Sequence, residues 1–597
     1  MKLRRRRLLA VSFCLLLVAV ASVQAPLPLP LVLSQDHAEP VDQLLIVTLP
    51  ALKDAALEYA AARKSAFAAG NGHALDTKVL TVPECIAAYP RINDPAQAVR
   101  AAAHAHLLPA AANVPTASAD SATLPGDDGS SARRYLLLIG DVPTSGQAVD
   151  PDRHVPCFYK HCQLVQEMPG VQAEWDDVAS DNPYAARDAD DDVPVLMVGR
   201  LPVSTPDAVR VYAAAVKEYE TSPPPGSWQR KVTLFAGDPG FKQLGAQVRD
   251  IIEKSYEQAV IKNLSDEFAV TLTYANPVSP YTWPAPDFGR RIVEEVNEGA
   301  MYLNYLGHGW KDSVDTLKFN GRRYEVFTAA EAAKVDCRKG RPVAAFFTCY
   351  TGCFDMRGPS LAEALITNPR GPIGVIASSR VSNEINLLLE MAFLNVATRQ
   401  GAVTLGELFT RTEREMLRLA LPIPPALAAG LGIPTHQGYS DAKRTHLWLY
   451  NMFGDPTVHL TRPRSFLGMR ASNPVQAGRM LETIVAAPQQ VRRIELRLEA
   501  PRDTVLNEPT PLDLTARETE VFEAMRENHS RVNQRLVATT FMPAEAGKPT
   551  RIRLSLPAGV PAGSYIVRVL GYDADGRLQT SGATRVNLRP DDGTSDF

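Results

Sequence analysis

Two apolar segments that each end at a reactive side chain constrain the fold of this chain most. Met301–Leu306 is followed by Gly-His308-Gly, and Val343–Phe347 is followed by Thr-Cys349-Tyr-Thr-Gly. Apolar runs of this length that stop at turn-forming residues are typical of buried strands in an open α/β sheet, where ligands bind beyond the carboxyl ends of the strands. An imidazole and a thiol placed there are the parts of a cysteine nucleophile and its acid/base partner. The two segments therefore favour a cysteine peptidase.

The segments around this pair alternate between strand and helix. Fully apolar strands separated by helices predict mostly parallel sheets with helices on both faces. After about residue 463 short strands with alternating apolar residues and turns predict an immunoglobulin-like β-sandwich. The expected parts, in order, are a signal peptide (1–25), an N-terminal extension (26–43), a first α/β subdomain (44–225, with a low-complexity insertion at 109–131), a second, catalytic α/β subdomain (226–463), the β-sandwich (464–590) and a tail (591–597).

The N-terminus has the three parts of an export signal. Basic Arg4–Arg7 precedes the apolar run Leu8–Val20, and small residues lead to a cleavage site at Ala25. A membrane span needs about 20 apolar residues, and this run is shorter, so we expect cleavage near Ala25 and no membrane span in the mature protein. The expected location is the periplasm, the cell surface or the extracellular medium.

The charge balance argues against one class of partner. The chain has 63 Lys and Arg against 66 Asp and Glu, a formal net charge of −3. Nucleic-acid-binding proteins carry a basic patch or stripe, and the sequence has none interleaved with aromatic residues. We therefore expect no nucleic-acid partner.

The cysteines after the signal do not form a disulfide scaffold, because six of them are too few for a chain of 597 residues. In an exported protein Cys157 and Cys162 are the first pair that we expect to be bonded, although pairing cannot be deduced from sequence. Their spacing lacks the second half of a zinc site, so zinc is not expected.

Several motifs of this chain, taken in their order along the sequence, resemble those of the gingipain-type cysteine peptidases, a bacterial branch of the caspase-like clan. The resemblance covers Leu44–Leu460 and rests on the following segments: Asn304–Gly309, Cys349–Phe354 with Leu361–Leu365 and Ile376–Ser378, Tyr450–Pro456, and Asp181–Pro202 in the first subdomain. It implies two αβα subdomains followed by an immunoglobulin-like domain, protein or peptide substrates and no required cofactor. Only Pro26–Asp42 precedes the first strand, so zymogen control by a long propeptide is not expected.

The resemblance also implies roles for single residues. Cys349 is the expected nucleophile and His308 the expected general acid/base, with Cys353 as the rival nucleophile. The backbone amides of Gly309 and Cys349 are expected to form the oxyanion hole. Asp312 is a candidate carboxylate to orient His308, while His446 and Asp455, in the closing segment, are expected to fix that helix and loop.

Substrate selection is expected to involve the loop after the last core strand. Ser378, Ser379, Arg380 and Glu384 are candidates for the wall of the S1 pocket, which holds the P1 side chain that precedes the cleaved bond. Arg380 would favour an acidic P1 residue and Glu384 a basic one. Family analogy favours the basic residue.

An acidic run in the first subdomain has two interpretations. Asp188, Asp190, Asp191 and Asp192 could bind calcium through oxygen ligands, but the glycine and final glutamate of an EF-hand loop are absent. The other interpretation is a solvated acidic loop.

Two further functions stay open from the residues alone. A cysteine peptidase forms an acyl-enzyme, and its acyl group could be transferred to an amine instead of water. The protein would then be a sortase-like transpeptidase of a secretion system. Alternatively, the chain could be an inactive surface-binding module that uses the β-sandwich. The presence of both His308 and Cys349 favours an enzyme.

Overall fold

The computed structural model describes most of the chain after the N-terminal segment. The described ranges are 41–71, 74–108, 132–165, 174–188, 192–237, 264–420, 437–465, 467–545 and 547–590. The expected signal peptide, the low-complexity insertion at 109–131 and the tail lie outside them. Within these ranges no helix is both long and apolar enough to cross a membrane.

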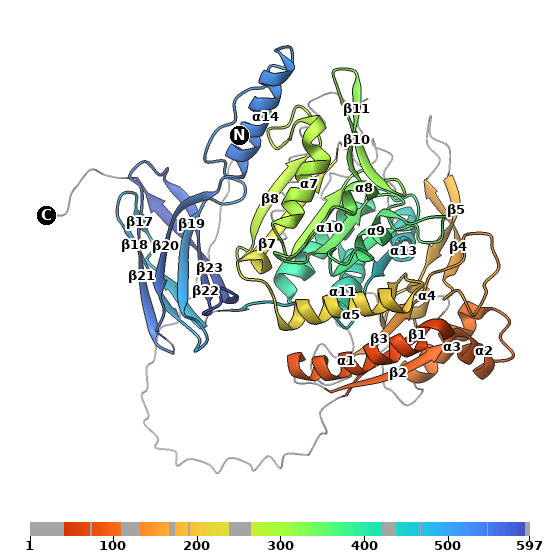
Figure 1. Ribbon diagram of the computed structural model, residues 1–597. Helices are drawn as coiled ribbons and strands as arrows, with labels where there is room; N and C mark the ends of the chain where they lie inside the picture. The colour runs from red at the N-terminus through yellow and green to blue at the C-terminus, as the bar shows by residue number, and fades with distance from the viewer. Residues whose placement is uncertain are drawn as a thin grey trace, which may run out of the picture. The chain divides into compact units, whose positions relative to one another are not determined.

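A ten-stranded, mostly parallel sheet forms the α/β part (Figure 1). The strands, in spatial order, are β2 (Leu75–Thr81), β1 (Asp42–Thr48), β3 (Arg134–Ile139), β6 (Met197–Leu201), β14 (Tyr450–Phe453), β13 (Gly374–Ser378), β12 (Val343–Phe347), β9 (Tyr302–Leu306), β7 (Lys231–Ala236) and β8 (Ala269–Tyr274). Their side chains are mostly buried and apolar, as parallel strands covered on both faces require. The predicted α/β class with a largely parallel sheet is confirmed.

The predicted subdomains share this sheet. β6 and β14 join the halves through a single register pair, Arg200 with Phe453, and β14 runs antiparallel to β13. The sequence pattern over 440–452 predicts a helix, but the chain leaves the helix after Leu449 and enters β14. The sheet pairing therefore overrides the helical pattern of the last residues.

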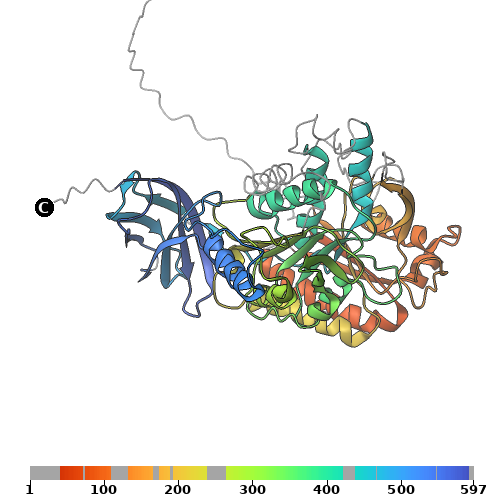
Figure 2. The same ribbon diagram turned by 90° about the horizontal axis from the view of Figure 1, so that it is seen from above.

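Helices cover both faces of the sheet (Figure 2), with α10 and α11 on one face and α1 and α7 on the other. The helices of the α/β part are α1 (Lys53–Asn71), α2 (Val82–Ala88), α3 (Pro95–Leu107), α4 (Asn182–Ala185), α5 (Pro206–Thr221), α7 (Phe288–Asn297), α8 (Ala329–Ala332), α9 (Leu361–Ile366), α10 (Ile385–Asn395), α11 (Leu405–Arg418) and α13 (Gln437–Leu449). Capping boxes begin α2 at Thr81 and α9 at Ser360, where a hydroxyl and a Glu side chain satisfy free backbone amides.

Two antiparallel hairpins that the sequence analysis did not predict lie outside this sheet. One pairs β4 (Phe158–Val165) with β5 (Glu174–Ser180), and the other pairs β10 (Ser313–Phe319) with β11 (Arg322–Thr328). The dipeptide Asn320-Gly321 forms the second turn, and both residues have positive φ. Asn-Gly between strands is a strong hairpin signal, so this hairpin could have been predicted.

The C-terminal part contains two antiparallel-rich sheets with a shared apolar core. The strands are β15 (Arg464–Ser465), β16 (Leu467–Ala471), β17 (Val475–Gln476), β18 (Met480–Ala486), β19 (Arg493–Glu499), β20 (Leu536–Pro543), β21 (Pro549–Ser555), β22 (Gly563–Tyr572) and β23 (Leu578–Arg589). Leu496 and Leu554, from different sheets, belong to one buried cluster. An unpredicted helix, α14 (Glu518–Asn533), separates β19 from β20.

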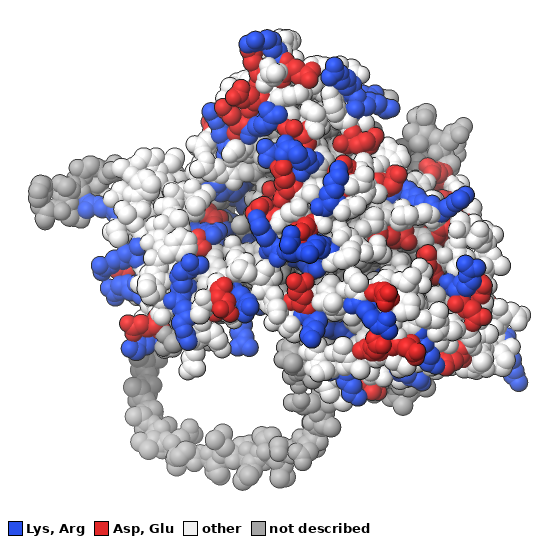
Figure 3. All heavy atoms as spheres, viewed as in Figure 1, with Lys and Arg blue, Asp and Glu red and all other residues white. Residues whose placement is uncertain are grey.

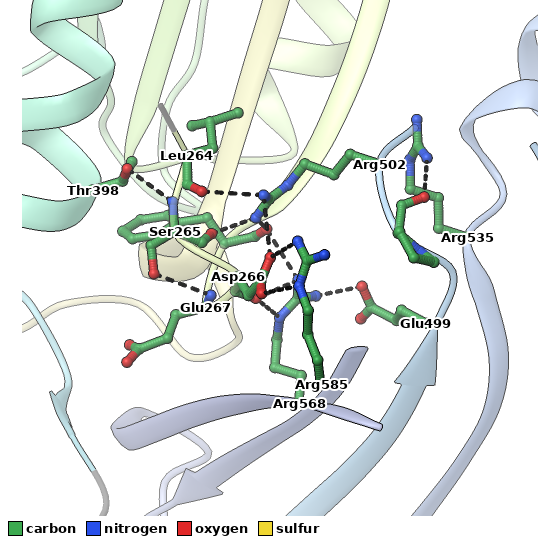
Figure 4. Close-up of polar contacts among 12 residues, drawn as sticks. Leu264, Ser265, Asp266, Glu267, Thr398, Glu499, Arg502, Arg535, Arg568 and Arg585 are labelled. Carbon is green, nitrogen blue, oxygen red and sulfur yellow. Dashed lines mark hydrogen bonds and ion pairs between the residues drawn. The ribbon is translucent and has the colours of Figure 1, made fainter. Parts of the chain in front are cut away.

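Arginines of the C-terminal part contact the segment that leads into β8 (Figure 4). Arg585 pairs with Asp266 at 2.8 Å, and Arg502 donates to the Leu264 carbonyl at 3.3 Å. Arg568 donates to the Phe268 carbonyl at 3.0 Å. Guanidinium groups satisfy several carbonyls at once, so these contacts hold the C-terminal part against the edge of the large sheet.

Acidic and basic side chains are interspersed on the face of the molecule shown in Figure 3. Some such pairs lie within one helix, as Arg290 and Glu294 do on α7. Neighbouring pairs of this kind neutralise each other, so this face carries no large patch of one sign.

Candidate active site

The strand order brings the two reactive residues to neighbouring strand ends. β9 and β12 are parallel, and their last register pair is Leu306 with Phe347. His308 and Cys349 each follow two positions beyond that pair. The His308 side chain is exposed, and Cys349 is half-buried. The imidazole and the thiol therefore belong to adjacent loops at the carboxyl edge of the sheet, where the sequence predicted them.

Gly309 lies directly against the backbone of the second loop. A Cβ at this position would be 2.4 Å from the Cys349 carbonyl oxygen and 2.8 Å from the Thr348 Cβ. Real Cβ atoms do not approach backbone oxygens so closely, so only glycine allows the two loops to meet. This contact is the most direct evidence that the two strand ends form one site.

The amide of Gly309 points away from its own hairpin. Gly309 is opposite Val314, and the hydrogen bonds on either side run from Trp310 N to Ser313 O and from Asp315 N to His308 O. In an antiparallel pair with this pattern, the two facing residues do not hydrogen-bond to each other. The N–H of Gly309 therefore points away from Val314. Among the residues that the structure describes, neither this amide nor that of Cys349 has an acceptor. Both N–H groups are available to a ligand.

A tight turn follows Cys349. Tyr350 has φ of 56°, and Thr351 N donates to the Cys349 carbonyl at 2.7 Å. A positive φ is rare for a residue with a large side chain and is found most often at functional sites. Gly352 follows, where a Cβ would lie 2.8 Å from that of Ala377. The turn is thus packed directly onto β13.

The Cys349 sulfur is surrounded by polar groups of Ser382. The Ser382 amide nitrogen lies 3.4 Å and its hydroxyl 3.7 Å from Sγ, and its carbonyl oxygen lies 3.5 Å away. Burial raises the pKa of the Cys349 thiol, while hydrogen bonds from Ser382 lower it and the charges of Glu174 and Asp315 raise it. Glu174, from the β4–β5 hairpin, is a carboxylate near the site that the sequence analysis missed.

Cys353 is placed differently from Cys349. It is fully buried, and burial raises its pKa to about 12. The thiolate is the nucleophilic form of cysteine, so Cys353 is poorly suited to be the rival nucleophile.

The predicted disulfide between Cys157 and Cys162 is wrong, because both thiols are free. Cys162 lies on β4, and Cys157 directly precedes that strand. Five residues of extended chain span about 16 Å, whereas bonded cysteines need Cα atoms within about 7 Å. The extended conformation of this segment keeps the two apart.

A buried carboxylate on β10 holds the His308 loop. Asp315 Oδ2 accepts hydrogen bonds from Tyr305 Oη at 2.8 Å and from His308 N at 3.1 Å. A Cβ at Gly237 or Gly307 would lie within 2.5 Å of the same oxygen. Asp312, the predicted orienting carboxylate, is exposed. Sequence analysis missed Asp315 because it missed the hairpin that positions it.

Three of the four predicted S1 residues have their polar groups engaged within the protein. Ser378 Oγ donates to the Arg380 carbonyl at 2.8 Å, and Ser379 Oγ donates to the Ala179 carbonyl at 2.7 Å. Arg380 is 2% exposed and forms a two-point ion pair with Asp355. Its charge is therefore balanced inside the fold, and it is poorly placed to select an acidic P1 residue.

Glu384 differs from these three. It is half-buried at the start of α10, and burial raises the pKa of its carboxyl. Among the described residues no Lys or Arg pairs with it. This leaves Glu384 as the member of the loop that could receive a basic side chain.

The acidic run lies only partly within the described residues, since Asp190 and Asp191 fall outside them. Asp188 is described, and Asp192 accepts hydrogen bonds from Trp448 Nε1 at 2.7 Å and from Lys160 at 3.4 Å. Among the described residues no group of three or more acidic, His or Cys side chains could hold a metal ion.

The two polar residues of the closing segment are buried. Burial lowers the pKa of His446 to about 4, and its Nδ1 lies 2.8 Å from the Ala442 carbonyl within α13. Asp455 accepts from Tyr59 Oη at 2.5 Å and pairs with Arg63 at 3.2 Å. These contacts fit the structural roles expected for both.

Comparison with known proteins gives one family match and several similar structures. The model of peptidase family C25 matches residues 37–461. The crystal structure of the Arg-specific cysteine proteinase gingipain R is 14% identical and covers 93% of this chain and 99% of its own, with a TM-score of 0.47. A complex of the pro- and mature domains of RgpB from Porphyromonas gingivalis is 15% identical, covering 91% and 100%, with a TM-score of 0.45. The comparison with curated proteins gives no match. The family match includes both strand ends.

Proposed function

This chain belongs to peptidase family C25 and is a cysteine-type endopeptidase, and we propose that it cleaves peptide bonds with Cys349 as nucleophile and His308 as general acid/base. The observation that carries the assignment is the contact between Gly309 and the Cys349 carbonyl. It joins the loop of the imidazole to the loop of the thiol. Cys353, which is fully buried, offers no comparable access.

In the proposed reaction, the Cys349 thiolate attacks the carbonyl carbon of the scissile bond and forms a tetrahedral intermediate. The amides of Gly309 and Cys349 donate to its oxyanion, which is the arrangement that stabilises such intermediates. His308 donates a proton to the leaving amine as the C–N bond breaks. Water, deprotonated by His308, then hydrolyses the thioester and regenerates the thiol. Apart from the substrate and water, each group in these steps belongs to the chain, so the proposed reaction needs no cofactor.

The expected substrates are proteins or peptides with a basic P1 residue. Glu384 supports this preference because it is a half-buried carboxylate near the Ser382 loop without a partner cation among the described residues. The enzyme is expected to act outside the cytoplasm after export. The two C-terminal sheets are proposed to be an immunoglobulin-like domain attached to the peptidase. Calcium binding at the acidic run stays a separate proposal, which calorimetry with added calcium would test.

A peptidyl electrophile library tests the assignment directly. A chloromethyl ketone or acyloxymethyl ketone with Lys or Arg at P1 should label the wild-type chain, and mass mapping should place the adduct on Cys349. Labelling at Cys353 instead would overturn the assignment of the nucleophile. Transfer of the acyl group to an added amine, without hydrolysis, would replace the peptidase by a transpeptidase.

A further inference from the structure

Three buried polar side chains form a continuous hydrogen-bonded chain that ends at the Cys349 sulfur. Ser382, Asn386 and Tyr450 are 8%, 7% and 1% exposed. Tyr450 Oη donates to Asn386 Oδ1 at 2.7 Å, and Asn386 Nδ2 donates to Ser382 Oγ, also at 2.7 Å. Ser382 Oγ in turn lies 3.7 Å from Sγ. The members come from β14, α10 and the loop before α10, so tertiary packing alone assembles them.

The direction of donation is defined for the first two links of this chain, from Tyr450 to Asn386 and from Asn386 to Ser382. The backbone amide of Thr348 is hydrogen-bonded to the Tyr450 hydroxyl, which directs the phenolic proton toward Asn386. The amide group of asparagine then donates through its nitrogen. Because Ser382 Oγ accepts this bond, its own proton can be donated to the sulfur, 3.7 Å away, or to the Tyr450 hydroxyl, with which the Ser382 side chain is also hydrogen-bonded.

We propose that Ser382 is a further catalytic residue, which stabilises the Cys349 thiolate by donating its hydroxyl and amide to Sγ, and that Asn386 and Tyr450 are positioning residues that orient this hydroxyl. The proposal rests on Cys349 being the nucleophile. A thiolate accepts hydrogen bonds strongly, and Ser382 supplies two neutral donors at one face of the sulfur.

Ser382 serves both protonation states of the thiol without rearrangement. In the neutral state the S–H group can donate to the Ser382 carbonyl, 3.5 Å away. After ionisation the amide at 3.4 Å and the hydroxyl at 3.7 Å donate to the sulfur. Such donors are needed here, because burial and the charges of Glu174 and Asp315 all oppose ionisation of Cys349.

Other buried serines nearby show what a purely structural serine looks like. The hydroxyl groups of Ser378 and Ser379 donate to backbone carbonyls at 2.8 and 2.7 Å, which fixes the loop. Ser180 is fully buried on β5, and its Oγ accepts from Asn182 N at 3.1 Å. The Ser382 hydroxyl instead approaches the reacting atom.

The test is the pH dependence of Cys349 alkylation by iodoacetamide in the full chain, followed by mass mapping. His308→Ala is used as the background so that the imidazole does not contribute. Ser382→Ala should raise the thiol pKa by about one unit, since a hydrogen bond to a charged group contributes about 1.5 kcal/mol. A thiol pKa one unit higher lowers the thiolate fraction at neutral pH roughly tenfold, but each thiolate is then more nucleophilic. The alkylation rate at neutral pH should therefore fall about threefold. The rate at high pH, where the thiol is fully ionised, should rise about threefold.

Four further variants separate catalysis from structure. Asn386→Leu and Tyr450→Phe should raise the pKa by smaller amounts in the same direction, and Ser382→Thr should restore most of the wild-type value. Ser180→Ala is the matched control and should leave the pKa unchanged.

An unchanged pKa in both Ser382→Ala and Tyr450→Phe would overturn the proposal, and so would an equal shift in Ser180→Ala. Tyr450→Phe keeps the shape of the ring and so remains informative if Ser382→Ala does not fold. Failure of the proposed function is visible separately, because it would move the peptidyl electrophile from Cys349 to another residue.

Discussion

The two loops of the active site are held in different ways. The Cys349 loop is packed onto β13, carries the strained Tyr350 and is surrounded by buried polar side chains. The His308 loop is exposed at its tip, and a single carboxylate, Asp315, holds its backbone. The nucleophile is thus fixed and partly removed from water, whereas the base can exchange protons with solvent. The difference fits the two tasks, since the acid/base residue gives a proton to the leaving amine and takes one from water at every turnover.

The largest difference in activity is expected between variants that lack one or the other of the two thiols in the Cys349 loop. Cys349→Ala should abolish peptidase activity, because no other group can form the acyl-enzyme. Cys353→Ala should keep most activity, since this buried thiol has a pKa raised to about 12 and stays protonated. Turnover of a fluorogenic peptide and thermal unfolding measure both variants. An active Cys349→Ala variant would show that Cys349 is not the nucleophile.

Removal of the base should be severe but incomplete. His308→Ala should lower kcat by about 10²–10⁴-fold, the usual contribution of general acid/base catalysis. Slow alkylation of Cys349 should persist, because a thiol is nucleophilic without an adjacent base. Measuring kcat and the rate of iodoacetamide labelling of the same variant tests this. If both turnover and labelling are lost, His308 also shapes the Cys349 loop.

The contact between the loops can be broken by one methyl group. Gly309→Ala should lower kcat about 10²–10³-fold, the cost of losing one oxyanion donor, because its Cβ would meet the Cys349 carbonyl. Gly559→Ala, in the C-terminal part, is the control, because this glycine has nothing near its Cβ and no positive φ. Equal losses in the two variants would remove the argument for an oxyanion hole.

The anchor of the His308 loop should affect stability more than chemistry. Asp315→Ala leaves the Tyr305 hydroxyl and the His308 amide without this acceptor, so we expect the free energy of unfolding to fall by about 2–3 kcal/mol. Asp312→Ala, at an exposed position three residues earlier, should change stability little. Denaturant titration of both variants measures this, and equal stabilities would contradict the role of Asp315 as the anchor.

The smallest expected effect concerns specificity. Glu384→Gln should reduce the preference for Lys or Arg at P1 about fivefold in kcat/KM, because a partly exposed ion pair contributes about 1 kcal/mol. Arg380→Gln is not a clean control, since it breaks the ion pair with Asp355. A panel of fluorogenic peptides with Lys, Arg, Ala and Glu at P1 decides the matter. Unchanged selectivity would mean that residues outside this loop determine the P1 preference.

Much of the α/β part could be predicted from local patterns. The apolar runs at 134–139 and 231–236 predict strands with the bounds of β3 and β7, and the helical patterns at 96–107 and 206–219 differ from α3 and α5 by one or two residues. Failures occurred where a long-range contact decided the structure. Tyr450–Phe453 continues a helical pattern but pairs with β13 and β6. Helix α14 lies within a region of alternating strands and contacts β8, where Asn533 bonds both backbone groups of Leu272.

The sequence by itself determined that His308 and Cys349 end two buried strands, because strand length, apolarity and the following turn residues are local properties. The family resemblance added the backbone amide of Gly309 as an expected oxyanion donor. Only the tertiary structure decided which groups surround these residues. Ser382 contacts the sulfur, with Asn386 and Tyr450 hydrogen-bonded behind it, Asp315 contacts His308, and Arg380 is neutralised by Asp355. These contacts depend on the order and register of strands far apart in the chain, and no local pattern of residues encodes that order.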